Sequence, residues 1–328
     1  MALALQPSLW ADVVRPCHPG SGGDSVISVQ AGTLQHRWRR LLAKPLAQPS
    51  YLLILQLTAV LILLHEIETF AWMRIPERLL ALAMLCAPRL MQSKGAWIAL
   101  SSLLVVNNLW RWSLLVNHEY LTTYWVLACT LALYAPAPEK VLAWNARLLI
   151  GLCFALAAIW KFLAGEYIDG SFLHLTFLLD SRLALGAFLL GGLEADLLQQ
   201  NRTLFDLLQT TGSVAPQALQ SSPRMAVISL ILSYWTIFIE AIAALSFLLP
   251  RPKILTRLRY AILLVFIFTT YTVIPVLAFG ALLLIMGLAQ CMQDCPYWNS
   301  FYLGTLLLLP VWMPLPQAVW GLWLGFAP

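Results

Sequence analysis

The chain has 328 residues, of which 60% are hydrophobic and only 11% are charged, whereas charged residues make up about 25% of an average soluble domain. This composition predicts an all-α integral membrane protein and excludes a large soluble catalytic domain. The formal net charge of +5 does not indicate nucleic-acid binding, because Lys and Arg lie mostly near the ends of apolar segments, where they set orientation in the membrane.

The first 50 residues differ from the rest of the chain. They contain the Pro-, Gly- and Ser-rich stretch "RPCHPGSGGDS" and the basic run "HRWRR", and they lack the central apolar stretch of a signal peptide. We expect residues 1–50 to form a flexible or surface-lying N-terminal tail. Residues 51–328 are expected to form a transmembrane helical domain.

Apolar runs then follow one another along the chain. A helix rises about 1.5 Å per residue, and the hydrocarbon core of a bilayer is about 30 Å thick, so about 20 apolar residues are needed to span it. The sequence predicts a polytopic bundle of about eight transmembrane helices, near 51–72, 77–92, 96–113, 121–137, 142–164, 225–249, 260–289 and 301–324.

The apolar segment 172–193 is interrupted at its centre by Asp180 and Arg182. If this segment crossed the membrane, the later basic loop "RPKILTRLRY" would lie on the side opposite "HRWRR", against the positive-inside rule. We therefore predict a re-entrant or interfacial segment at 172–193 and an outer-side excursion at 194–224. The same argument places the N-terminus on the cytoplasmic side.

This orientation brings polar residues from several predicted spans to one depth, near their outer ends. They are Lys161, Glu166, Asp169, His65, Glu66, Glu68, Asn107, Asn108, Arg111 and the "NHEY" stretch from Asn117 to Tyr120. Unpaired ionisable groups are costly in hydrocarbon, so they are expected to face one another or a wet cavity. We predict a polar chamber that opens toward the outer leaflet, with Asn117, Tyr120, Glu166, Asp169 and Arg111 as ligand-binding residues.

The pattern leaves two interpretations open for the candidate catalytic residues. Lys161 lies near a helix end, where its methylenes can extend to the headgroups and leave the amine in water. Held inside the bundle, the same amine would instead lose part of its charge and accept a proton. His118 is a surface residue in one reading and a proton shuttle in the other.

Glu240 is the single charge in the predicted sixth span, and Arg147 lies near the inner end of the fifth. Because a buried charge requires a partner, we predict that these two residues form a structural charge pair.

No metal site is predicted. The segment with His65, Glu66 and Glu68 contains only one His, so it cannot present two His ligands on one helical face. It also has no third ligand nearby in sequence. Cys291 and Cys295 can form a disulfide if their loop faces an oxidising compartment, although cysteines at this helical spacing are also often free.

Two motifs resemble a known family. "NHEYL" at 117–121 is followed, about forty residues later, by an apolar helix that ends in "KFLAGEYIDG". This order resembles the membrane domain of vitamin K-dependent gamma-carboxylase and its bacterial relatives, the horizontally transferred transmembrane (HTTM) family. There, an Asn-His-x-Tyr-Leu stretch precedes the base lysine, and an acidic-Gly pair ends nine residues beyond it. Lys161, Asp169 and Gly170 match this spacing.

The resemblance implies that Lys161 is the base, that His118 assists it, and that the substrate is a reduced naphthoquinone or another quinone. Two departures limit the transfer. An aromatic-His pair of the family is replaced by Thr269 and Thr270 in "FIFTTYTVIP", and the soluble domain that holds a protein substrate is absent from this sequence. Carboxylation of protein glutamates is therefore not expected.

The sequence supports two functional hypotheses and leaves open whether the protein is an enzyme. One is a lipid-embedded site for a quinone or isoprenoid lipid, with membrane lipids and a hydrophobic small molecule as the partners. The other is a non-catalytic membrane scaffold or assembly factor that keeps the fold. A small-solute transporter is disfavoured, because no internal repeat is visible.

Overall fold

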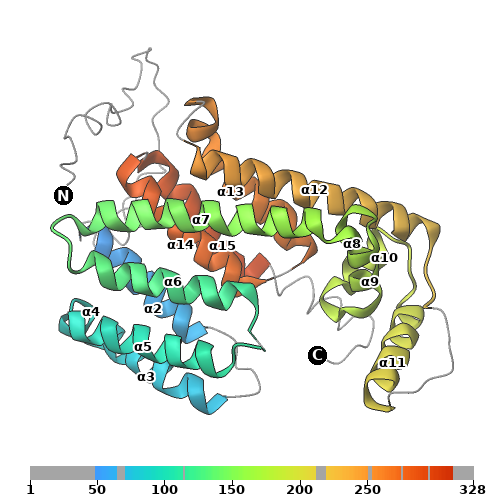
Figure 1. The fold of residues 1–328 in the computed structure, drawn as a ribbon, viewed down its shortest axis with the longest axis horizontal. Helices are drawn as coiled ribbons and strands as arrows, with labels where there is room; N and C mark the ends of the chain where they lie inside the picture. Colours follow the sequence, from blue (N-terminus) through green and yellow to red (C-terminus); the bar gives the residue numbers. More distant parts are fainter. Residues whose placement is uncertain are drawn as a thin grey trace, which may run out of the picture.

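The structure, a computed structural model, describes residues 49–64, 71–113, 115–211, 219–249, 253–274, 276–294 and 296–312. Every regular element within these ranges is a helix, as the composition predicts. Figure 1 shows their arrangement. The helices are α2 (Ser50–Leu64), α3 (Ala71–Cys86), α4 (Pro88–Met91), α5 (Lys94–Trp110), α6 (Asn117–Ala132), α7 (Pro138–Leu163), α8 (Gly165–Ile168), α9 (Ser171–Leu179), η2 (Ser181–Leu183), α10 (Ala184–Leu189), α11 (Ala195–Thr211), α12 (Pro223–Leu248), α13 (Lys253–Val273), α14 (Leu277–Asp294), η3 (Pro296–Trp298) and α15 (Asn299–Trp312).

Two helices of the described chain, α7 and α12, are long and apolar enough to cross a membrane, each with 26 residues. A third candidate is the bent pair formed by α9 and the η2–α10 segment. Other apolar helices, including α2 and α15, are shorter, and residues 260–289 are divided between α13 and α14. The structure therefore supports two or three spans by length and composition, and not the predicted eight.

The bend in segment 172–193 lies where the charges interrupt it. The two halves, Ser171–Leu179 and Ser181–Leu189, meet at 94°. The Asp180 carboxylate accepts a hydrogen bond from the Arg182 backbone N–H at 2.9 Å, which begins a new helix in another direction. Because this contact competes with helix continuation, the break follows from the residue types. Whether the segment is re-entrant stays a prediction.

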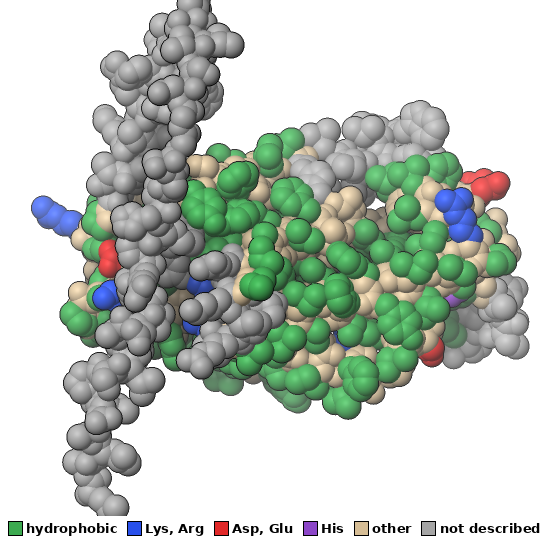
Figure 2. Space-filling view, turned by 90° about the horizontal axis from the view of Figure 1, so that it is seen from above, with side chains coloured by type: hydrophobic (Ala, Val, Ile, Leu, Met, Phe, Trp, Pro, Cys, Tyr) green, Lys and Arg blue, Asp and Glu red, His purple; other side chains and the backbone are tan. Residues whose placement is uncertain are grey.

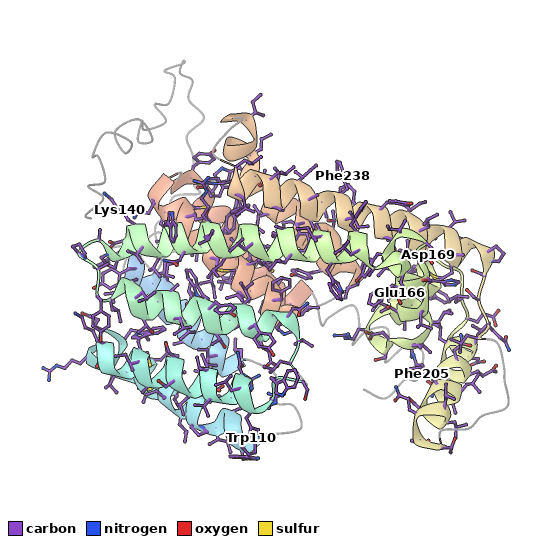
Figure 3. All side chains as sticks on the ribbon, in the orientation of Figure 1. Trp110, Lys140, Glu166, Asp169, Phe205 and Phe238 are labelled. Atoms are coloured by element: carbon purple, nitrogen blue, oxygen red, sulfur yellow. The ribbon has the colours of Figure 1, made fainter. Side chains whose placement is uncertain are left out.

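Helices α7 and α12 pack side by side in antiparallel directions (Figure 1). At the C-terminal end of α12, the Leu248 side chain packs on Gly151 in the middle of α7, where an added Cβ would lie 2.6 Å from it. At the other end, Gly170 follows α8, and its added Cβ would lie 2.9 Å from the Leu230 Cα atom. Helix α12 thus begins beyond the end of α7 and extends along α8 and α9. Figure 3 shows Lys140 near the start of α7, with Glu166 and Asp169 past its end.

We expect Gly170→Ala to lower the free energy of unfolding by about 2 kcal/mol, measured by chemical denaturation in detergent. Gly170 has a φ of 78°, a left-handed conformation that costs a residue with a Cβ about 1–2 kcal/mol. Contact with the Leu230 backbone adds to this cost. Gly165→Ala is the matched control, since nothing lies within 4 Å of an added Cβ there. Equal effects of the two substitutions would contradict the role given to Gly170.

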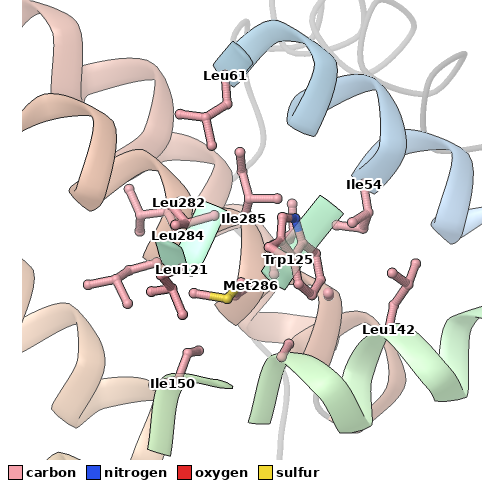
Figure 4. Close-up of a cluster of buried hydrophobic side chains, with 14 of the residues drawn as sticks. Ile54, Leu61, Leu121, Trp125, Leu142, Ile150, Leu282, Leu284, Ile285 and Met286 are labelled. Carbon is pink, nitrogen blue, oxygen red and sulfur yellow. The ribbon is translucent and has the colours of Figure 1, made fainter. Parts of the chain in front are cut away.

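The main core lies between α2, α6, α7 and α14 (Figure 4). Trp125 is fully buried at its centre, and its indole Nε1 donates to the Thr58 hydroxyl at 3.0 Å. Thr58 in turn donates to the Ile54 carbonyl at 2.8 Å. The outer surface is also largely apolar, and the charged side chains visible in Figure 2 lie mostly toward its ends. Such a surface suits a chain that is surrounded by lipid.

Candidate functional site

Lys161 lies in the last turn of α7, and its ammonium forms an ion pair with Glu240 of α12. The Lys161 and Glu240 side chains are only 14% and 7% exposed. The amine also lies 5.3 Å from the centroid of the Tyr167 ring in α8. Lys161 therefore faces the protein, as the second of the two sequence interpretations requires, and does not extend outward.

Two polar atoms beside this ion pair are buried without a hydrogen-bond partner among the described residues. One is the second carboxylate oxygen of Glu240, Oε2, and the other is the hydroxyl of Tyr271 in α13. Tyr271 is within electrostatic reach of both Glu240 and Cys153. We refer to Lys161, Glu240, Tyr167, Tyr271 and Cys153 as the Lys161 cluster. Because unsatisfied buried polar groups are rare, this cluster is a candidate ligand site.

The predicted ion pair between Arg147 and Glu240 is wrong, because Glu240 has a different partner. Arg147 Nε donates to the Phe247 carbonyl at 2.7 Å, and Glu240 pairs with Lys161. Seven residues, about 10 Å of helix rise, separate Phe247 from Glu240. The prediction failed because it took α12 to begin at the depth where α7 ends, whereas α12 begins beyond the end of α7.

A second group of charges lies between α3, α5 and α6, and we call it the arginine–glutamate network. Arg74 Nη2 donates to Glu119 Oε2 at 2.5 Å, and Arg74 Nη1 lies 3.4 Å from Glu77 Oε2. Asn107 donates to Glu77 Oε1 at 3.0 Å, and Arg111 Nη1 lies 3.8 Å from Glu119 Oε2. All five residues are buried, and two cations balance two anions.

The network changes the role of one predicted site residue. Arg111 was expected to bind a ligand, and the structure places its guanidinium near the carboxylate of Glu119. The sequence patterns do not single out Arg74, Glu77 or Glu119 as partners. The spacing of Arg74 and Glu77, three residues apart in a short apolar segment, was the available signal, because such residues share one face of a helix.

The remaining residues of the "NHEY" stretch lie at the start of α6. The half-buried ring of His118 stacks on Phe279 of α14, with ring centroids 6.1 Å apart. Phe279 is in turn 6.3 Å from Tyr271, so ring contacts connect His118 with the Lys161 cluster. Asn117 is exposed, and the Tyr120 hydroxyl donates to the Trp112 carbonyl at 2.9 Å.

Glu166 and Asp169 both lie exposed on or beside α8, past the end of α7 (Figure 3), and neither is the partner in the ion pair that Lys161 makes with Glu240. The Asp169 carboxylate accepts a hydrogen bond from the backbone N–H of Ser171 at 2.8 Å. Hydrogen bonds from Ser171 lower the pKa of Asp169. Asp169 therefore stabilises the start of α9, and the partner of the Lys161 amine is Glu240, from a different helix.

No group of three or more His, Cys, Asp or Glu residues that could hold a metal occurs in the described part of the chain. His65, Glu66, Glu68 and Cys295 lie outside the described residues. The disulfide between Cys291 and Cys295 stays a prediction.

Comparison of the chain with protein-family models, with curated proteins and with solved structures gives no significant match. The resemblance to the HTTM family therefore stays a prediction that depends on the two quoted motifs.

Proposed function

We propose that the chain is a multi-pass membrane protein with a cytoplasmic N-terminus, and that the Lys161 cluster binds a quinone or isoprenoid-type lipid. The observation that carries the proposal is the unpartnered carboxylate oxygen of Glu240 beside the Lys161 ammonium. A quinol supplies the missing donor, because its hydroxyl can donate to Glu240 Oε2. Its oxygen can also accept a hydrogen bond from the ammonium of Lys161.

The surroundings of the ion pair suit a ring-shaped apolar ligand. Tyr167 presents its ring to Lys161, and Tyr271 has a buried hydroxyl without a partner among the described residues. Aromatic faces pack well against a quinone ring, and a hydroxyl supplies a further polar contact. An isoprenoid tail would extend into the lipid along the apolar outer face of α7, where Leu156 and Trp160 are exposed.

The same geometry supports removal of a proton from a quinol. In a quinol-oxidising enzyme similar to the carboxylase membrane domain, but without protein carboxylation, this would be the first step, and molecular oxygen would be the oxidant that accepts the electrons. When the Lys161 ammonium gives its proton to Glu240, the neutral amine can accept the proton of a quinol hydroxyl. That step leaves a quinolate and restores the ammonium. In this mechanism Lys161 is the base, and His118 assists from the far side of Phe279 and Tyr271.

The first experiment is to purify the full chain from membranes in mild detergent and to identify bound lipids by mass spectrometry. Binding of a reduced naphthoquinone is then measured by quenching of Trp fluorescence. We expect Lys161→Met and Glu240→Gln each to weaken binding at least tenfold. Lys140→Met, at an exposed lysine at the start of α7, is the control and should leave affinity unchanged. Unchanged affinity in both site variants would overturn the proposal.

A specific observation also favours the second hypothesis, a non-catalytic scaffold or assembly factor. Lys161 already has an anionic partner, and the charges of the arginine–glutamate network balance one another. In a scaffold, Lys161→Met would lower the stability of the protein or the amount of partner protein that co-purifies with it. It would not change the affinity for any quinone.

A further inference from the structure

A groove of about 350 Å³ lies on the surface between α5 and α6, apart from the Lys161 cluster. It is lined by Ile98, Ser101, Ser102, Val105, Val106, Leu127 and Thr130. Serine side chains on α5 leave the space that larger side chains would fill. The walls are apolar, and Ile98 and Val106 are 46% and 58% exposed, so the groove opens to the surroundings of the helices.

The polar atoms in the floor of the groove have partners within the protein. The hydroxyls of Ser101 and Thr130 lie 2.7 Å apart. Thr130 also hydrogen-bonds to the Val126 carbonyl at 2.9 Å and lies 3.2 Å from the Trp97 carbonyl. The other hydroxyl in the lining belongs to Ser102, which is an exposed residue. Because the buried hydroxyls of Ser101 and Thr130 are satisfied, an occupant need not supply polar atoms to them. A hydrocarbon chain meets this condition.

One end of the groove carries an unbalanced positive charge. Lys94 begins α5, one turn before Ile98, and its exposed amine lies 4.4 Å from the centroid of the Tyr134 ring. No ion pair within the described residues involves Lys94. Arg89 in α4 and Lys140 in the first turn of α7 are also exposed. Helix α4 and the starts of α5 and α7 lie at the same end of the bundle (Figure 1). This end is the one that the charge pattern assigns to the cytoplasmic side.

We propose that this groove binds one acyl chain of an anionic phospholipid, whose phosphate is held by Lys94. The residues from Ile98 to Val106 extend over about 12 Å of helix, enough for part of an acyl chain. The phosphate then lies about one helical turn further on, where the amine is held by Tyr134. Basic residues at a membrane surface attract anionic headgroups, which are concentrated in the cytoplasmic leaflet. The proposal depends on placement in a membrane and not on the quinone site.

The test uses the full chain in detergent with phosphatidylglycerol and phosphatidylcholine of identical acyl chains, and native mass spectrometry measures the retained lipid. We expect phosphatidylglycerol to be retained about fivefold more than phosphatidylcholine. Lys94→Gln should remove this preference and leave a weaker retention of both lipids. Ser102→Trp, which fills the groove from an exposed position, should remove retention of both. Lys140→Gln is the control for a general effect of positive charge and should retain the preference.

Three results would overturn the proposal. The first is equal retention of the two lipids by the unmodified chain, and the second is unchanged retention in both Lys94→Gln and Ser102→Trp. The third is a dimer of the unmodified chain that Ser102→Trp converts to a monomer, because the groove would then hold a second copy of the chain. Thermal unfolding of each variant in the same detergent checks that Ser102→Trp is folded.

Discussion

Replacing Glu119 with Ala is expected to lower the free energy of unfolding by about 3–5 kcal/mol, because removal of one member of a buried ion pair leaves an uncompensated charge. Glu119 is only 3% exposed, and its Oε2 atom lies 2.5 Å from Arg74 and 3.8 Å from Arg111. Without this carboxylate, the network contains two buried guanidinium groups and only one carboxylate, that of Glu77. The effect should be among the largest of any single substitution in the chain.

Denaturant titration in detergent, followed by Trp fluorescence, measures this loss. Glu166→Ala is the matched control, since it removes an exposed carboxylate and should change stability by less than about 0.5 kcal/mol. Glu119→Gln tests the importance of charge separately from volume, and we expect it to be nearly as destabilising as Ala. A loss of less than about 1 kcal/mol for Glu119→Ala would show that the network does not hold α3, α5 and α6 together.

Much of the local structure could be predicted from the sequence, because hydrophobic runs and interrupting charges determine it directly. The all-helical class followed from composition, and the bend at Asp180 followed from two charges inside an apolar segment. Lengths were less predictable. In place of the predicted single span at 260–289 there are two helices: α13 ends at Val273 and α14 begins at Leu277. The sequence has Pro275 between these two positions, and a proline lacks the backbone N–H that a continuous helix needs.

The sequence could predict that Lys161 belongs to the candidate site, but it could not predict which side chain pairs with Lys161. The side chain of Lys161 is mostly covered by the protein, with 14% of it exposed, as one interpretation required. Its partner is nevertheless Glu240 and not Glu166 or Asp169, which lie nearby in sequence. Partner choice depends on the relative shift of α7 and α12, and the close approach of Gly170 to Leu230 is one of the contacts found with that shift. No periodicity within one helix contains this information.

The second large effect is expected at Lys161. Lys161→Met leaves the Glu240 carboxylate buried without its cation, so we expect a loss of about 3–5 kcal/mol in the free energy of unfolding. The double variant Lys161→Met with Glu240→Met removes both charges and fills the space with apolar atoms. Such replacements are often neutral or stabilising, so the double variant should be about as stable as the unmodified chain. Lys140→Met, outside the pair, should have little effect.

The double variant also separates the two functional hypotheses, because it removes the polar groups without removing the fold. If it is as stable as the unmodified chain but has lost naphthoquinone affinity, the ion pair is kept for its chemistry. If the unmodified chain binds no quinone and the double variant still assembles with its partners, the pair is a structural contact between α7 and α12. A double variant less stable than either single variant would contradict the pairing of Lys161 with Glu240 itself.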